Sequence, residues 1–138
     1  MLNFLKKDSK ESIENPIIKI TALLIHAAKI DENYTNLEKE IIKKTLLKIG
    51  ANKENVDDVV NEGEKIEKNS VQILEFTKEV KSLSESNKIL IVETLWKIIY
   101  SNLEADVYET SLMRRLAGLL YIDNKIMGDI KEKIKKNL

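Results

Sequence analysis

Cysteine is absent from the 138-residue chain, and histidine occurs once. The absence of cysteine excludes disulfides, thiolate zinc sites and cysteine nucleophiles, and it fits a reducing compartment, so we expect a cytoplasmic protein. A single domain of this length can bury a core without disulfide or metal staples. Without a second histidine or a serine motif, nucleophilic triads and zinc hydrolase sites have no support. We therefore expect no enzymatic activity.

An excess of charge of one sign is also lacking. The 23 basic and 23 acidic residues are interleaved, so no uniform field favours nucleic acid or an anionic membrane. The most apolar run, residues 17–30, is interrupted by Lys19, His26 and Lys29, which is typical of a buried helix and not of a membrane span or signal peptide. The expected partner is another protein, with no nucleic acid and no stable membrane insertion.

Helix breakers are scarce, since the chain has one proline and four glycines. Apolar residues recur every three or four positions, which predicts helices throughout. The first helix should begin near Pro16, and a second should cover residues 36–49 and stop at Gly50. Residues 89–99 are apolar around the whole girth of their helix, so this helix and the first should be central. The side chains expected to cap the later helices are Asn52, Ser70, Ser84, Asp106 and Asp123.

An internal repeat organises the chain. Residues 17–59 align with residues 88–130 without a gap, at a constant offset of 71 residues. Apolar, capping and acidic positions coincide, so helix, loop, helix, loop and helix occur twice around an unmatched middle helix. We predict an all-α fold, a single compact bundle of about seven helices with a pseudo-twofold relation between its halves. The domain should cover residues 1–138, with residues 1–13 as a short N-terminal extension.

Two acidic loops, residues 31–38 and 102–109, each join an apolar helix to an amphipathic one. Their oxygen donors are of the kind that hard divalent cations such as calcium, magnesium or manganese prefer. An EF-hand is excluded, because Asn36 and Val107 occupy the positions where glycine should turn the chain. The candidate metal ligands are Asp31, Asn33 and Glu38 in the first loop and Asn102, Glu104, Asp106 and Glu109 in the second.

The same loops also fit an interpretation without metal. Thr35 with Glu38, and Asp106 with Glu109, have the spacing of a capping box, in which two residues satisfy each other's exposed backbone amides at a helix start. This accounts for the fifth and eighth positions of each loop, and leaves the other donors as solvated loop residues. The metal site and the capping boxes both remain open as explanations.

Two segments, AAKIDENYTNLEKEIIKK and LWKIIYSNLEADVYETSLMRRLAGLL, resemble the tellurite-resistance protein B (TerB) family over roughly residues 17–130. The resemblance implies an all-helical fold, a metal site made by acidic residues and a link to stress response. In the family each repeat carries Asp-Gly followed by a glutamate. Asp31 and Glu38 match the first motif, and Glu109 matches the second.

The chain departs from the family pattern at both glycines, since Glu32 and Leu103 replace them, and Asn102 replaces the second aspartate. Calcium affinity rises with the number of anionic ligands, and glycine permits the turns that wrap carbonyls around an ion, so a lower affinity is expected. The leading hypothesis is a non-enzymatic interaction or scaffold module tuned by a divalent cation. The alternatives are a metal-free adaptor and, ranked last, a carboxylate-based metal-dependent hydrolase.

The remaining polar and aromatic residues are predicted to have structural roles. His26 should be a hydrogen-bonded core or boundary residue. Arg114 and Arg115, the only arginines, should pair with Asp106, Glu109 or the first loop. Core or boundary positions are expected for the aromatic residues Trp96, Tyr100, Tyr108 and Tyr121.

Overall fold

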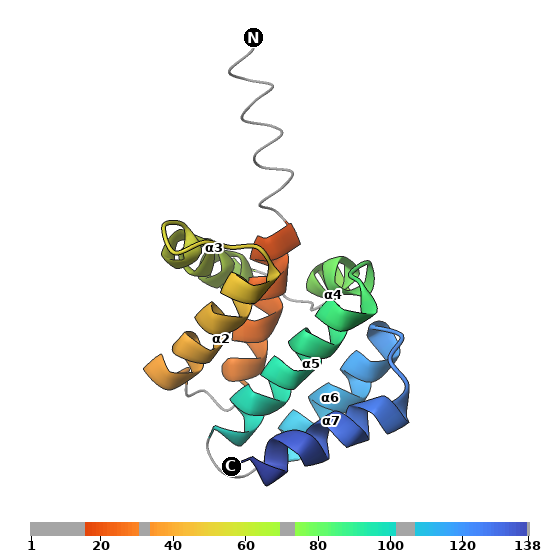
Figure 1. Cartoon of the computed structure of the whole chain (residues 1–138). Helices are drawn as coiled ribbons and strands as arrows, with labels where there is room; N and C mark the ends of the chain where they lie inside the picture. The colour runs from red at the N-terminus through yellow and green to blue at the C-terminus, as the bar shows by residue number, and fades with distance from the viewer. Residues whose placement is uncertain (1–15, 31–33, 70–73, 102–106, 138) are drawn as a thin grey trace.

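The computed structural model describes residues 16–30, 34–69, 74–101 and 107–137, without the side chains of 74–75 and 107–110. Every regular element in this part of the chain is an α-helix, which confirms the predicted all-α fold (Figure 1). No helix among these residues is long and apolar enough to cross a membrane. The elements are a first helix over residues 16–28, then α2 (Asn36–Ile49), α3 (Val56–Asn69), α4 (Leu74–Lys81), α5 (Glu85–Tyr100), α6 (Val107–Leu119) and α7 (Asn124–Lys136).

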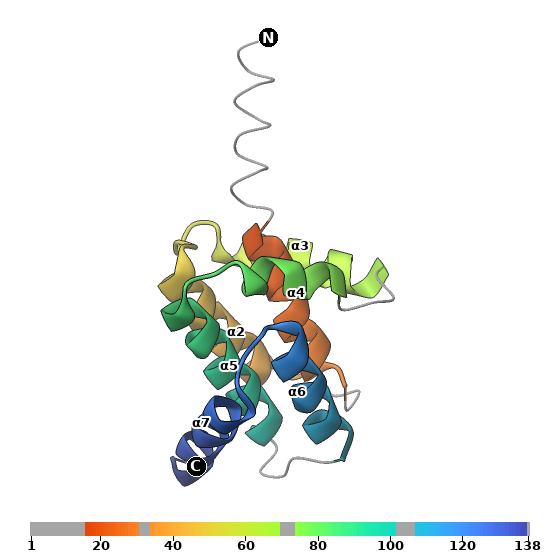
Figure 2. The same cartoon turned by 90° about the vertical axis from the view of Figure 1, so that its right-hand side faces the viewer.

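The helices form a bundle around α5. Figures 1 and 2 show the first helix and α5 running toward one end of the molecule, while α2 and α6 return from that end. Helix α5 packs against α2, α4 and α7, and α6 packs against α4 and α7. The central position of α5 follows from its sequence, because a helix that is apolar on all sides needs neighbours on all sides.

The first helix and α5 supply much of the apolar core, as predicted. Leu23 and Leu24 of the first helix and Leu95 and Ile99 of α5 are 0% exposed. Burying one such side chain contributes about 1.5–3 kcal/mol. These helices therefore fix the frame on which the loops and the surface residues are held.

The helix ends follow the predicted local signals. Gly50 ends α2 with φ of 136°, a conformation that favours glycine. Ser84 and Asp123 cap α5 and α7 by accepting hydrogen bonds from backbone amides. The carbonyl of the Asn52 side chain accepts from the amides two and three residues later, at 3.0 and 2.9 Å, in the turn that leads into α3. The caps predicted at Ser70 and Asp106 lie outside the described residues.

The internal repeat stays a prediction, although one local feature recurs at its offset of 71 residues. The amide of Ala51 donates to the carbonyl of Leu46 after α2, and the amide of Ile122 donates to that of Ala117 after α6, both at 2.9 Å. The residue directly before each donor, Gly50 in the first case and Tyr121 in the second, has a positive φ. A symmetry relating the whole halves, and the extent of the domain over 1–138, stay predictions.

Helix α3 crosses the first helix at Gly63. A Cβ atom at Gly63 would lie 2.6 Å from Cγ2 and 2.9 Å from Cβ of Thr21. Thr21 is fully buried, and its hydroxyl donates to the carbonyl of Ile17 at 2.7 Å. The crossing therefore has no room for any side chain at position 63.

Candidate functional site

The helix ends that flank the two acidic loops lie at the same end of the bundle. The first helix and α5 end there, and α2 and α6 begin there (Figures 1 and 2). We call this the loop end. The sequence alone could not place the loops relative to each other, whereas the fold puts the segments that lead into and out of them on one side of the molecule.

At the start of α2, Thr35 and Glu38 form the predicted capping box. The amide of Glu38 donates to the Thr35 hydroxyl at 3.1 Å, and the Thr35 amide donates to Oε1 of Glu38 at 2.8 Å. The Thr35 hydroxyl also donates to the same carboxylate oxygen at 3.1 Å. Glu38 is 1% exposed, so its carboxyl group is met by hydrogen bonds within the protein and not by solvent.

Tyr34 lies directly before this capping box. Its hydroxyl is buried and has no hydrogen-bond partner among the described residues. Burial, followed by the negative charges of Glu64 and Glu38, raises the pKa of Tyr34 well above its usual range. The start of α2 therefore combines a buried carboxylate with a buried neutral phenol.

Tyr34→Phe is expected to weaken the loss of stability at alkaline pH. The folded protein holds Tyr34 neutral, while in the unfolded chain the phenol ionises near its ordinary pKa of about 10. The contribution of Tyr34 to the free energy of unfolding is present below pH 10. It is lost as the pH rises toward the raised pKa of Tyr34 in the folded state. Urea unfolding at pH 8 and pH 11 should show a smaller difference in the variant, by about 1 kcal/mol. Tyr121→Phe, at an exposed phenol, is the control, and equal pH dependence in all three proteins would contradict the assignment.

Of the seven predicted metal ligands, Glu38 is the one whose side chain the structure describes. Asp31, Asn33, Asn102, Glu104 and Asp106 lie outside the described residues, and Glu109 belongs to α6 without a described side chain. Among the described side chains, no group of three or more His, Cys, Asp or Glu residues is arranged to hold a metal ion. The two-loop cation site therefore stays a prediction.

His26 is a hydrogen-bonded boundary residue, as expected. Its Nδ1 lies 3.3 Å from Oε2 of Glu67, and Nζ of Lys29 lies 2.9 Å from Oε1 of the same carboxylate. These contacts connect the first helix to α3. His26 also lines a cavity of about 390 Å³ together with Arg115.

The two arginines are exposed on α6. The ion pairs found between described side chains include neither Arg114 nor Arg115. Their predicted partners, Asp106, Glu109 and the first loop, lie largely outside the described side chains, so this prediction stays untested. Lys43, which the repeat alignment places opposite Arg114, forms an ion pair with Asp57, with Nζ 2.8 Å from Oδ1.

The aromatic residues divide into two groups. Trp96 and Tyr100 are 3% and 5% exposed, and their rings stack with centroids 5.9 Å apart, as predicted for core residues. The prediction is wrong for Tyr121, which is 72% exposed with φ of 56°. Tyr121 lies in the turn after α6, on the surface. Nζ of Lys81 lies over its ring, 4.2 Å from the ring centre. The side chain of Tyr108 is outside the described residues.

An apolar groove at the loop end was missed by the sequence analysis. Its volume is about 390 Å³, and Leu37 at its edge is 59% exposed. We call it the loop-end groove. The spacing of Leu37 and Ile41 on α2 was a usable signal, but the walls from the other helices could not be assigned without the fold. Its lining residues are Leu37, Ile41, Lys97, Tyr100, Ser101, Ile134 and Asn137.

A comparison with family models matches residues 18–132 to Tellurite resistance protein TerB. The chain belongs to the TerB family. The match covers most of the chain and agrees with the resemblance carried by the two loop motifs. No curated protein and no solved structure matches the chain significantly. TerB membership accounts for the all-helical fold and leaves the ligands and partners to be inferred from the residues.

Proposed function

We propose that this TerB-family chain is a non-enzymatic interaction module whose loop-end groove binds an amphipathic helix of a partner protein, under the influence of a divalent cation in the acidic loops. The observation that carries the proposal is the position of the groove. Its walls include the start of α2, directly after the first acidic loop, and the end of α5, directly before the second. A cation bound by ligands of either loop would act on a wall of the groove.

The lining supports a helical partner. Leu37 and Ile41 are separated by one helical turn of α2, and Tyr100 of α5 and Ile134 of α7 also line the groove. An amphipathic helix presents apolar anchors at the same spacing, which is how helices bind in grooves. Burying the exposed Leu37 side chain on binding would contribute about 1.5–3 kcal/mol. The apolar lining thus supplies affinity.

The charges around the groove favour an acidic partner. Lys97 is the charged residue among those lining it. On α2, Lys44 and Lys48 follow Leu37 and Ile41 along one face of the helix, and both are exposed. A partner helix with glutamates beside its leucines would match this pattern and gain in association rate and specificity.

The proposal is tested with a synthetic amphipathic peptide, carrying leucines at i, i+3, i+4 and i+7 and glutamates elsewhere, titrated into the chelator-stripped protein. Backbone NMR shifts should concentrate at Leu37, Ile41, Tyr100 and Ile134. Leu37→Ser should weaken binding about tenfold, because it removes one buried leucine contact. Leu47→Ser is the matched control, since Leu47 is 40% exposed on α2 and does not line the groove.

The cation is tested in the same experiment with calcium, magnesium or manganese. Binding of the ion should be saturable, should tighten peptide binding, and should have no effect in Asp31→Asn. If the two leucine variants bind equally, or if the peptide shifts no groove residue, the groove is not the interaction surface. If the peptide binds and all three ions are without effect, the cation part of the proposal fails alone.

Peptide binding without any effect of the three ions is the prediction of the second candidate function, a metal-free adaptor. The capping box at Thr35 and Glu38 is the observation that favours it, because these contacts satisfy the start of α2 without an ion. In that case the groove would still bind helices. The link to stress response that the family resemblance implies is a separate expectation, to be tested by the phenotype of cells lacking the protein.

A further inference from the structure

A cavity that is open to solvent lies between α5, α6 and α7, apart from the loop-end groove and from the cavity lined by His26. It has a volume of about 160 Å³, and its lining combines the indole of Trp96 with the thioethers of Met113 and Met127. Engineered apolar cavities of about 150 Å³ bind benzene, so the space suits one six-membered ring or a branched aliphatic group. Flexible methionine side chains can adapt to such a ligand.

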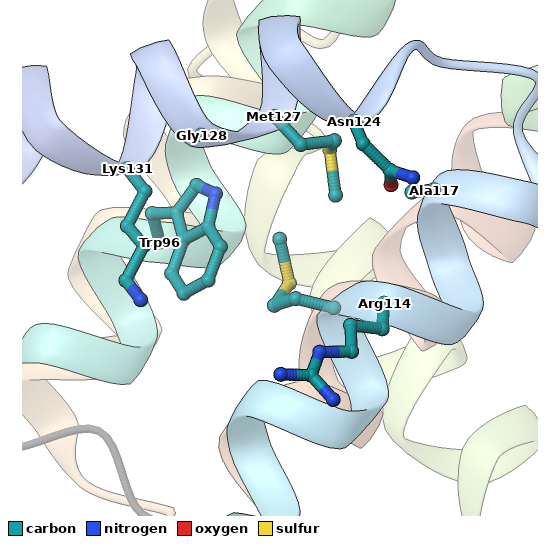
Figure 3. A pocket seen from close by; sticks show the side chains of 8 residues that line it. Trp96, Arg114, Ala117, Asn124, Met127, Gly128 and Lys131 are labelled. Carbon is teal, nitrogen blue, oxygen red and sulfur yellow. The ribbon is translucent and has the colours of Figure 1, made fainter.

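The polar residues around this cavity are cationic or neutral. Arg114 and Lys131 line it together with the amide of Asn124, and none of the described residues that line it is acidic. Figure 3 shows the Arg114 side chain extending from α6 toward the side formed by Trp96 and Lys131. The ammonium of Lys131 lies 5.4 Å from the centre of the Trp96 ring. The ion pairs found between described side chains include neither Arg114 nor Lys131, and both side chains carry the positive charge that would attract an anion.

The indole of Trp96 has an unused hydrogen-bond donor. Its Nε1 is buried without a partner in the described part of the chain, although Trp96 is 3% exposed. Buried donors in folded proteins are nearly always paired, and each exception calls for an explanation. In Figure 3 this nitrogen lies on the edge of the ring nearer α7, where Met127 and Gly128 also line the cavity.

We propose that this cavity binds a small amphipathic anion, an aromatic or branched aliphatic carboxylate. Its apolar body packs against Trp96 and the two methionines, and its carboxylate faces Arg114 and Lys131. This assignment takes account of the size of the cavity, the aromatic wall and the two cations at once. A purely inorganic anion would leave the apolar wall unused, and a neutral ring would leave the cations unused.

The test uses the intrinsic fluorescence and the indole N–H resonance of Trp96, the only tryptophan in the chain. Benzoate is the probe, with benzyl alcohol and inorganic phosphate as comparisons. Benzoate should change both signals saturably at millimolar concentration or below. Arg114→Gln should weaken its binding about tenfold, as expected for a lost charge-assisted contact. Arg115→Gln is the matched control, since Arg115 lines another cavity.

A second pair of variants tests the cavity itself. A Cβ at Gly128 or at Gly118 would meet nothing within 4 Å, so both positions are open at the Cβ, and leucine is introduced at each. Gly128→Leu should fill the cavity and abolish the benzoate response, while Gly118→Leu, on α6 and outside the lining, should keep it. The proposal is overturned if benzoate changes neither signal, if both leucine variants respond equally, or if phosphate or benzyl alcohol binds as tightly as benzoate.

Discussion

Gly63→Ala is expected to lower the free energy of unfolding by about 1–3 kcal/mol, despite alanine's higher helix propensity. The added methyl group would lie 2.6 Å from Cγ2 of Thr21, a separation that packed atoms do not tolerate. Relief requires α3 to move away from the first helix, whose core residues would then lose contacts. Urea unfolding should show a lower midpoint, and thermal unfolding a melting temperature lower by roughly 3–10 °C.

Gly118→Ala is the matched control for this prediction. Its methyl group would meet nothing within 4 Å, so the gain in helix propensity should leave it neutral or stabilising by up to about 1 kcal/mol. Thr21→Ser removes the Cγ2 atom and should recover part of the loss in Gly63→Ala, which a double-mutant cycle measures as coupling. Equal effects of the two glycine substitutions would mean that the crossing is looser than the structure indicates.

Glu38→Ala is expected to destabilise the protein by about 2–3 kcal/mol. The substitution deletes a carboxylate that is 1% exposed and leaves the Thr35 amide without the acceptor it meets at 2.8 Å. Loss of a helix cap costs about 1 kcal/mol, and a buried unsatisfied group adds about 1–3 kcal/mol. Chemical unfolding in the presence of a chelator measures this effect without any contribution from metal.

Glu38→Gln separates the capping role from a role in cation binding. The side-chain oxygen of the glutamine can still accept a hydrogen bond from the Thr35 amide. In the presence of a chelator, Glu38→Gln should therefore lower the free energy of unfolding by less than half as much as Glu38→Ala does. If Glu38 is also a cation ligand, Glu38→Gln should lose the stabilisation that calcium gives to the unmodified protein. A glutamine variant as unstable in chelator as the alanine variant would show that the capping geometry is not the source of the stability.

The features that the sequence predicted correctly are those decided by neighbouring residues. Thr35 and Glu38 are three positions apart, so their capping box could be recognised from spacing, and Gly50 marks a helix end by its backbone freedom alone. The apolar girth of α5 predicted its central position. In each case a short stretch of chain contains all the information that the structure uses.

The features that sequence reasoning missed depend on helices that are distant in the chain. Gly63 has no recognisable motif, and its importance comes from Thr21 on another helix. The loop-end groove needs α2, α5 and α7 together. Tyr121 was expected at a core or boundary position because aromatic residues usually lie there, but it is 72% exposed in a turn where its φ is positive. For the metal site, ligand types could be predicted, whereas their distances depend on how the two loops approach each other.

The position of Asn137 in the wall of the loop-end groove has a practical consequence for how the protein is attached in binding experiments. The first helix begins at the opposite end of the bundle from the start of α2 (Figure 1). A surface linkage made at the end of α7 would begin beside the groove and compete with any partner for it. A linkage made at the start of the first helix would leave the groove open, so partner searches that use the two orientations should give different results.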